Sequence, residues 1–205
     1  MAEKISVLFD SYHLYHLPQF DPVIDLLVKD DRFQIYHSTS AENKNEERDL
    51  CLKILGSKPG TLIYAETEKE RAEKIKSLSL DVFICGWSRY KINKFVPKST
   101  LVGMIYHGIG VKPSYWRDNS SRLDIRFVEG PYRMDQLRDH GIKTELALTG
   151  FPKLDPLFQE NSTHIDSIKS TLGLDPNKRT ILFAPTFYPS SIERFGLLLG
   201  DLTRD

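Results

Sequence analysis

Short apolar runs alternate with amphipathic stretches along the first 150 residues of the chain. "ISVLF", "DVFICG" and "TLVGMIY" are almost entirely apolar, which is typical of parallel strands covered on both faces. "DPVIDLLVKD" instead repeats apolar residues at helical spacing, with Asp21 as the expected N-cap and Pro22 at the first helical position. This alternation predicts an α/β fold, a Rossmann-like parallel sheet with helices on both faces.

The remaining segments extend the alternation. The expected strands are "RFQIYHS", "TLIYA", "IRFVEG" and "TELALTG", and the expected helices are "NKNEERDLCLKIL", "TEKERAEKIKSL" and "PYRMDQLRDHG". Thr67 with Glu70 three residues on is a capping-box pattern, and Pro131 and Gly141 suit the start and the end of a helix. Pro18 indicates a loop between the first strand and its helix.

The pattern changes after residue 150. "THIDSIKSTLGLD" predicts an amphipathic helix, and "RTILFAPTF" predicts a new strand that begins at Arg179. We therefore expect a Rossmann-like domain over residues 1–150, an interdomain linker and helix over 151–178, and the beginning of a second α/β domain over 179–205. The last region is shorter than a usual domain, so this second domain is expected to be incomplete.

Charge is balanced over the whole chain but not along it. The 28 basic and 28 acidic residues cancel, which argues against the broad basic field of a nucleic-acid-binding protein. Between Val82 and Arg117 there is no acidic residue, and the basic residues of this window are Arg89, Lys91, Lys94, Lys98, Lys112 and Arg117. Such a surface suits an anionic substrate or the acidic lipid face of a membrane, although chance clustering in a solvated loop gives the same pattern.

Two further features bear on location. Cys51 and Cys85 are far apart in the sequence, so neither a disulfide framework nor a zinc site is indicated. No apolar run reaches the length that spans a bilayer. We expect a cytoplasmic protein whose membrane contact, if it makes one, is peripheral and on the inner face of the cell membrane.

The segment "MIYHGIGVKPSYW" carries the strongest chemical signal. Gly108 and Gly110 can expose successive backbone N–H groups to an anion, and Lys112 adds a positive charge. His107, with an ordinary pKa of about 6.5, is suited to deprotonate a hydroxyl, and it is equally suited to hydrogen-bond the turn. The segment contains neither the full G-x-G-x-x-G fingerprint nor the G-x-x-x-x-G-K-[ST] loop.

Other candidate residues also follow expected strands. Arg89 and Lys91 belong to the basic window and are expected to bind substrate at the strand ends, where ligands of such sheets lie. Glu129 precedes an expected helix N-terminus, where it can contact a ligand or form a structural turn. His13 and His16 are three residues apart, but no third ligand accompanies them, so no metal site is predicted. Their position still puts them near the ligand crevice.

Three motifs together resemble a known family. "YHGIGVK", "TGFPKLDPLF" and "TILFAPTF" occur in an order and spacing similar to those of the CDP-glycerol glycerophosphotransferases, the teichoic-acid primases and polymerases. The resemblance covers about the last half of the chain. It implies a GT-B fold, in which an N-terminal Rossmann-like domain binds the acceptor and a C-terminal domain binds the nucleotide donor. The implied reaction transfers glycerol phosphate from CDP-glycerol to an acceptor hydroxyl in cell-envelope polymer synthesis, with no further cofactor.

Carried over by position, the resemblance makes His107 the catalytic base and makes Pro185 and Thr186 the first donor-side loop. Phe187 and Tyr188 stand where the family commonly has Trp-Arg, which removes a cation from the donor side. The family's second catalytic histidine belongs to a C-terminal region that this sequence lacks. The resemblance therefore implies a chain that is inactive alone and needs that region to bind its nucleotide-activated donor.

Two alternatives stay open. A nucleotide-sugar glycosyltransferase or a UDP-sugar 2-epimerase relative with the GT-B fold has the same strand pattern. A domain that only binds an anionic polymer or a lipid, without catalysis, also accounts for the basic window. For the glycerophosphotransferase, the expected acceptor is an anionic polymer or a lipid-linked chain.

Overall fold

The computed structural model describes residues 3–87, 91–110, 112–117, 122–158, 163–184 and 191–202. The chain forms two compact units, Met1–Gln159 and Glu160–Asp205. The first unit contains the sheet and all the site residues that are described below. The second unit contains the helices α7 (Thr163–Thr171) and α8 (Ile192–Leu202).

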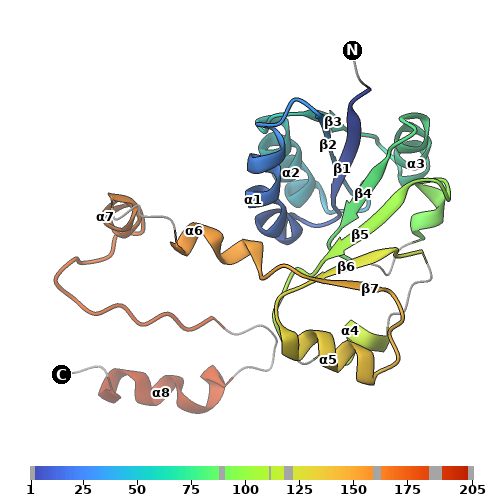
Figure 1. Ribbon diagram of the computed structural model, residues 1–205. Coiled ribbons are helices and arrows are strands. Elements are labelled where there is room, and N and C mark those ends of the chain that lie inside the picture. The colour runs from blue at the N-terminus through green and yellow to red at the C-terminus, as the bar shows by residue number, and fades with distance from the viewer. Residues whose placement is uncertain are drawn as a thin grey trace. The chain divides into compact units, whose positions relative to one another are not determined.

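The described strands of the first unit form one seven-stranded parallel sheet (Figure 1). In order along the sheet they are β3 (Thr61–Ile63), β2 (Phe33–Thr39), β1 (Ile5–Ser11), β4 (Val82–Cys85), β5 (Leu101–Ile105), β6 (Ile125–Val128) and β7 (Glu145–Leu148). The chain first builds outward from β1 to β3 and then returns to the other side of β1. The carboxyl ends of β1 and β4 therefore flank a switch point, where open α/β sheets bind ligands.

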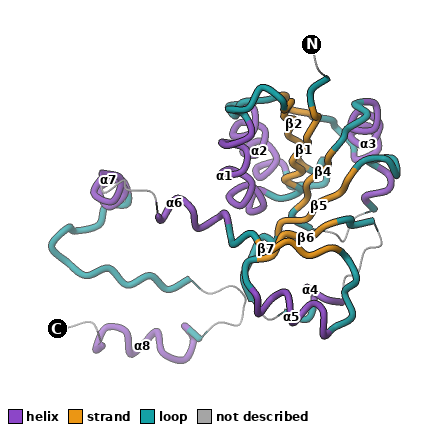
Figure 2. Tube along the Cα trace, in the orientation of Figure 1, coloured by secondary structure: helices purple, strands orange, loops and turns teal. Residues whose placement is uncertain are grey.

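Helices and single 3₁₀ turns connect the strands (Figure 2). In the first unit they are η1 (Leu14–His16), α1 (Leu17–Leu27), α2 (Asn45–Gly56), α3 (Glu68–Ser77), η2 (Ile92–Lys94), α4 (Ser114–Arg117), α5 (Pro131–Asp139), η3 (Pro152–Leu154) and α6 (Asp155–Phe158). The predicted cap of α3 is confirmed, because the Thr67 side chain accepts a hydrogen bond of 3.2 Å from the backbone N–H of Glu70.

Side chains alternate across β1 and pack on both faces of the sheet. Phe9 faces α1, where its ring centre lies 5.6 Å from that of the fully buried Phe20. Leu8 faces the opposite side and belongs to a core with Ile75 of α3 and Leu137 of α5. The predicted fold class, a Rossmann-like parallel sheet with helices on both faces, is confirmed.

The predicted start of the first helix at Asp21 is wrong. Helix α1 begins at Leu17, five residues before Pro22, which was the predicted first helical position, and Pro18 lies in its first turn instead of in a loop. Proline is tolerated there because the N–H that it lacks would have no partner within the helix. Leu17, Phe20 and Ile24 are all buried, so the apolar face extends one turn further toward the N-terminus than predicted.

The predicted strand that begins at Arg179 is not present over residues 179–184, which have no regular secondary structure. A strand needs a neighbour to satisfy its backbone hydrogen bonds, and the described part of the second unit contains no other strand. The continuation of the predicted strand, residues 185–187, lies outside the described residues.

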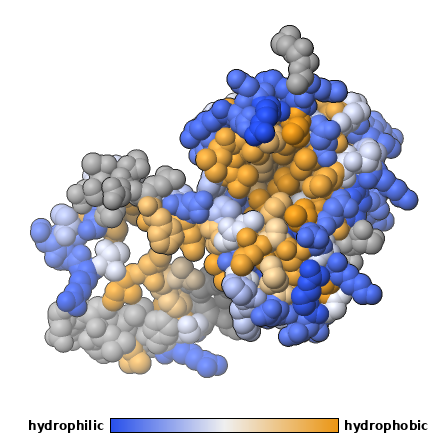
Figure 3. Space-filling view, viewed as in Figure 1, coloured by the Kyte–Doolittle hydropathy of each residue, from blue (hydrophilic) through white to orange (hydrophobic). Residues whose placement is uncertain are grey.

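An open apolar groove of about 320 Å³ lies on the α1 side of the sheet (Figure 3). Its lining includes Phe9, Ile84, Ile105 and Phe127 from the strands and Val23 from α1. None of the described residues that line it is charged. This groove is therefore unsuited to a phosphate or a nucleotide, and the candidate site lies instead at the carboxyl edge of the sheet.

Candidate functional site at the carboxyl edge of the sheet

Three neighbouring strands end at the switch point. Tyr12 follows β1, Gly86 and Trp87 follow β4, and His107 comes two residues after β5. Because β1 pairs with β4 and β4 pairs with β5, these strand ends lie side by side. The fold thus brings the predicted His107 turn to the crevice where ligands of such sheets bind.

The imidazole of His107 is held by the end of β4. Its Nδ1 atom lies 2.9 Å from the carbonyl oxygen of Gly86. A carbonyl oxygen can only accept, so Nδ1 carries the hydrogen and the lone pair of the neutral ring is on Nε2. In the sequence analysis, hydrogen bonding of the turn is the alternative to catalysis by His107. The observed hydrogen bond is compatible with catalysis, because it sets the tautomer in which Nε2 can act as a base.

The turn after His107 is fastened by side chains of α4 and α5. The Tyr115 hydroxyl donates to the carbonyl of Gly108 at 3.1 Å, and the guanidinium of Arg133 donates to the carbonyl of Gly110. Arg133 also lies 4.5 Å from the centre of the Tyr115 ring and bonds Oε1 of Glu129 at 2.9 Å. Glu129 thus supports the turn through Arg133, a residue that the sequence analysis did not single out.

Aromatic and imidazole rings surround His107. The ring centres of Tyr15 and His16 lie 5.2 and 5.1 Å from that of His107. His13 stacks on Tyr15 with an interplanar angle of 17° and also contacts Trp87 at 5.8 Å. Among the described side chains no group of three or more His, Cys, Asp or Glu residues is placed to hold a metal ion. His13 and His16 are therefore part of the ring of aromatic and imidazole side chains around His107, which we call the wall of the site.

His16 is an unusual member of this wall because it is fully buried. Burial, together with the nearby charges that His107 and His13 would carry, lowers the pKa of His16 to about 3. The ring is therefore neutral at physiological pH. Gln19, three residues further along, is also fully buried. Sequence reasoning considered His16 as half of a metal pair and placed it near the ligand crevice, but it did not consider Gln19.

A second concavity, a groove of about 490 Å³, lies between α3 and the segment after β4. Its basic side chains are Lys69, Lys76, Lys91 and Lys94. Tyr12 links the groove to the His107 site, because it lines the groove while its ring centre lies 5.2 Å from that of Trp87. Lys91, predicted to bind substrate, is therefore a groove residue, and His107 is not among the residues that line this groove.

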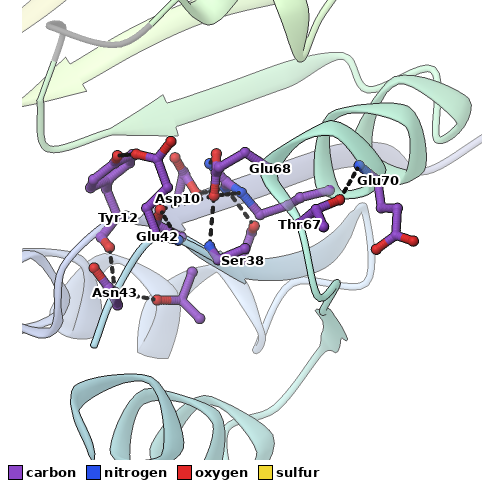
Figure 4. A network of polar contacts seen from close by, with 12 residues as sticks. Asp10, Tyr12, Ser38, Glu42, Asn43, Thr67, Glu68 and Glu70 are labelled. Atoms are coloured by element: carbon purple, nitrogen blue, oxygen red, sulfur yellow. Dashed lines mark hydrogen bonds and ion pairs between the residues drawn. The ribbon is translucent and has the colours of Figure 1, made fainter. Parts of the chain in front are cut away.

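An ion network borders the groove and joins β1, β2 and α3 (Figure 4). Arg71 is fully buried and donates to Asp10 at 2.6 Å, to Ser38 at 2.9 Å, and to both carboxylate oxygens of Glu68 at 2.8 and 2.9 Å. Burial alone would raise the pKa of Glu68, but the hydrogen bonds and charge of Arg71 outweigh it and lower that pKa. Glu68 therefore stays ionised, and the network fixes this part of the edge.

The remaining predicted residues have different positions. Lys112 is exposed shortly after the His107 turn. Arg89, Pro185 and Thr186 lie outside the residues that the structure describes.

Residues 118–199 match the model of the family described as CDP-Glycerol:Poly(glycerophosphate) glycerophosphotransferase. Over these residues the chain is similar to this family. The match confirms the glycerophosphotransferase resemblance predicted from the three motifs. It begins after the His107 turn, so the part assigned to that histidine depends on the geometry given above. No curated protein matches this chain in sequence.

Solved structures share the fold of this chain. A UDP-GlcNAc 2-epimerase from Neisseria meningitidis, solved with UDP-GlcNAc, matches with a TM-score of 0.57 at 13% identity, over 86% of this chain and 56% of its own. A glycosyltransferase from Rickettsia africae matches with a TM-score of 0.54 at 13% identity, over 98% and 58%. The chain thus spans little more than half the length of these GT-B-like structures. No described helix is long and apolar enough to cross a bilayer.

Proposed function

We propose that this chain is the acceptor-binding part of a GT-B transferase that moves glycerol phosphate from CDP-glycerol to an acceptor hydroxyl. The observation that carries the proposal is the 2.9 Å bond from His107 Nδ1 to the Gly86 carbonyl, which presents a basic Nε2 at the switch point. The family match over residues 118–199 supports glycerol phosphate as the transferred group.

In the proposed reaction an acceptor hydroxyl attacks the β-phosphorus of CDP-glycerol. A new P–O bond forms to the acceptor oxygen, the bond between the two phosphates breaks, and CMP leaves. Nε2 of His107 takes the hydroxyl proton as the bond forms. The Gly86 carbonyl then accepts a stronger hydrogen bond from the Nδ1–H of the resulting imidazolium.

The acceptor in this proposal is an anionic polymer or a lipid-linked chain, reached by peripheral contact with the membrane. The groove supports an anionic acceptor, because four lysines, Lys69, Lys76, Lys91 and Lys94, line it together with three glutamates, Glu42, Glu68 and Glu73. Glu68 is paired with Arg71. Tyr12 borders both the groove and the rings around His107. A chain that reacts at His107 can therefore continue into the groove, where its phosphates meet the lysines.

Donor consumption tests the proposal against the GT-B alternatives. The longest natural form of the protein is incubated separately with CDP-glycerol and with UDP-GlcNAc, in the presence of an oligo(glycerol phosphate) acceptor. Release of CMP and lengthening of the acceptor are expected with CDP-glycerol only. Turnover of UDP-GlcNAc alone would instead make the protein a nucleotide-sugar glycosyltransferase or an epimerase. Acceptor binding without turnover of either donor would leave only the binding function.

A further inference from the structure

Two buried polar side chains beside His107 have no hydrogen-bond partner among the residues that the structure describes. His16 and Gln19 are both fully buried, and neither ring nitrogen of His16 nor either amide atom of Gln19 is paired within the structure. Leaving such an atom buried and unpaired costs about 1–3 kcal/mol, and folded proteins rarely do so. Four such atoms in two adjacent side chains indicate that a bound ligand supplies their hydrogen bonds.

The two side chains come from consecutive elements, η1 and α1. His16 ends η1 and Gln19 follows in the first turn of α1, so the helical spacing places both on one face. Both pack against Gly86, where a Cβ atom would lie 2.9 Å from Cγ of His16 and 3.0 Å from Nε2 of Gln19. The end of β4, which hydrogen-bonds His107, is thus also the strand end against which His16 and Gln19 pack.

The pair offers donors and acceptors without charge. A neutral imidazole provides one donor and one acceptor, and a glutamine amide provides both kinds as well. A hydroxyl also donates and accepts, so it can satisfy both side chains at once. A phosphate or carboxylate only accepts and carries a charge that the buried pair does not balance. The pair therefore suits a hydroxyl of a sugar or polyol.

We propose that His16 and Gln19 bind a second hydroxyl of the acceptor, on the carbon next to the hydroxyl that His107 deprotonates. The inference rests on the proposed function and specifies its acceptor as a 1,2-diol. The ring centres of His16 and His107 are 5.1 Å apart, so the two imidazoles can contact the two oxygens of one diol.

The ring of Tyr15 covers the approach to the pair. Its centre lies 4.6 Å from that of His16 and 5.2 Å from that of His107, yet the residue is 49% exposed. An exposed aromatic ring can change rotamer on the ps–ns timescale. Rotation of Tyr15 admits the diol to both imidazoles.

Two matched probes test this inference by calorimetric titration of the chain without donor. sn-Glycerol 3-phosphate carries the diol, and 3-hydroxypropyl phosphate keeps the terminal hydroxyl and the phosphate but lacks the middle hydroxyl. Sites that hydrogen-bond a hydroxyl reject analogues that lack it, so we expect at least about tenfold tighter binding of the diol. Gln19→Met and His16→Leu are expected to bring this ratio close to one. Gln34→Met, at an exposed position on β2, is expected to leave it unchanged.

Thermal unfolding of the variants separates ligand binding from a structural role. Gln19→Met removes an unpaired buried amide, so its midpoint is expected to equal or exceed that of the wild type. Equal affinity for both probes, binding of neither probe, or a destabilised Gln19→Met chain that keeps the diol preference would each overturn the inference. The titration contains no donor, so its result does not depend on whether the protein transfers glycerol phosphate. If the protein transfers glycerol phosphate but binds both probes equally, this inference is overturned and the proposed function is not.

Discussion

The carbonyl oxygen of Gly86 accepts a 2.9 Å hydrogen bond from Nδ1 of His107, joining the ends of two neighbouring strands, β4 and β5. On the other side of Gly86, His16 and Gln19 approach so closely that only a glycine fits. The position of the carbonyl, and with it the orientation of His107, thus depends on packing behind β4. A base with a fixed orientation loses less free energy in reaching the transition state.

Gly86→Ala is expected to disturb both stability and catalysis. The new Cβ would lie 2.9 Å from Cγ of His16, so the ring or the strand end must shift. Such overpacking typically costs about 1–3 kcal/mol of the free energy of unfolding, which urea denaturation measures. Gly56→Ala is the matched control, because its Cβ would meet only Leu62 Cδ2 at 3.8 Å at the end of α2. A Gly86→Ala protein as stable as the control would contradict the tight packing.

Arg71→Met is expected to be among the most destabilising single changes in the first unit. It leaves the carboxylate of Asp10, which is fully buried, without its 2.6 Å ion pair. Removing one partner of a buried pair typically costs about 3–5 kcal/mol, again measurable in urea. The double variant Asp10→Leu with Arg71→Met removes both charges and is expected to recover part of the loss. A single variant as stable as wild type would show that the pair is dispensable.

Stability is expected to depend on pH through His16. The pKa of His16 is about 3 in the folded chain and about 6.5 when unfolded. Between these values the unfolded chain binds a proton that the folded chain does not, so the free energy of unfolding falls as pH decreases. The slope from one such group is at most about 1.4 kcal/mol per pH unit.

The contribution of His16 is isolated by a difference measurement, since the pKa of the buried His37 is lowered too. His16→Gln keeps a neutral polar side chain that does not titrate. Urea denaturation of both proteins from pH 7.5 to pH 4.5 is expected to show a shallower pH dependence for the variant. Parallel curves would mean that His16 is protonated as readily in the folded chain as in the unfolded one.

Periodicity predicted most of the sheet because the strands of a buried parallel sheet are continuous apolar runs. It fails at α1, because Pro18 predicts a loop there although the spacing of Leu17, Phe20 and Ile24 already marks one buried helical face. It fails again after Arg179, because a strand depends on a neighbour that local sequence does not supply.

The candidate site could be predicted in part. A histidine at the end of an apolar run identifies His107, but its hydrogen bond to Gly86 depends on the pairing of β4 with β5. His16 and Gln19 join it only because β1 also pairs with β4. The fully buried Arg71 was equally hidden, since arginine is usually exposed and its burial reflects partners on distant segments.

The most direct test of the account replaces His107 with Ala in the longest natural form of the protein and measures glycerol phosphate transfer from CDP-glycerol. A general base contributes about 10²- to 10⁴-fold, so the rate is expected to fall by that factor while the fold, followed by circular dichroism, is retained. His140→Ala, an exposed histidine whose Nδ1 bonds the Gln136 carbonyl, is the control and is expected to keep the wild-type rate. A His107→Ala protein that transfers glycerol phosphate at the wild-type rate would contradict the central claim.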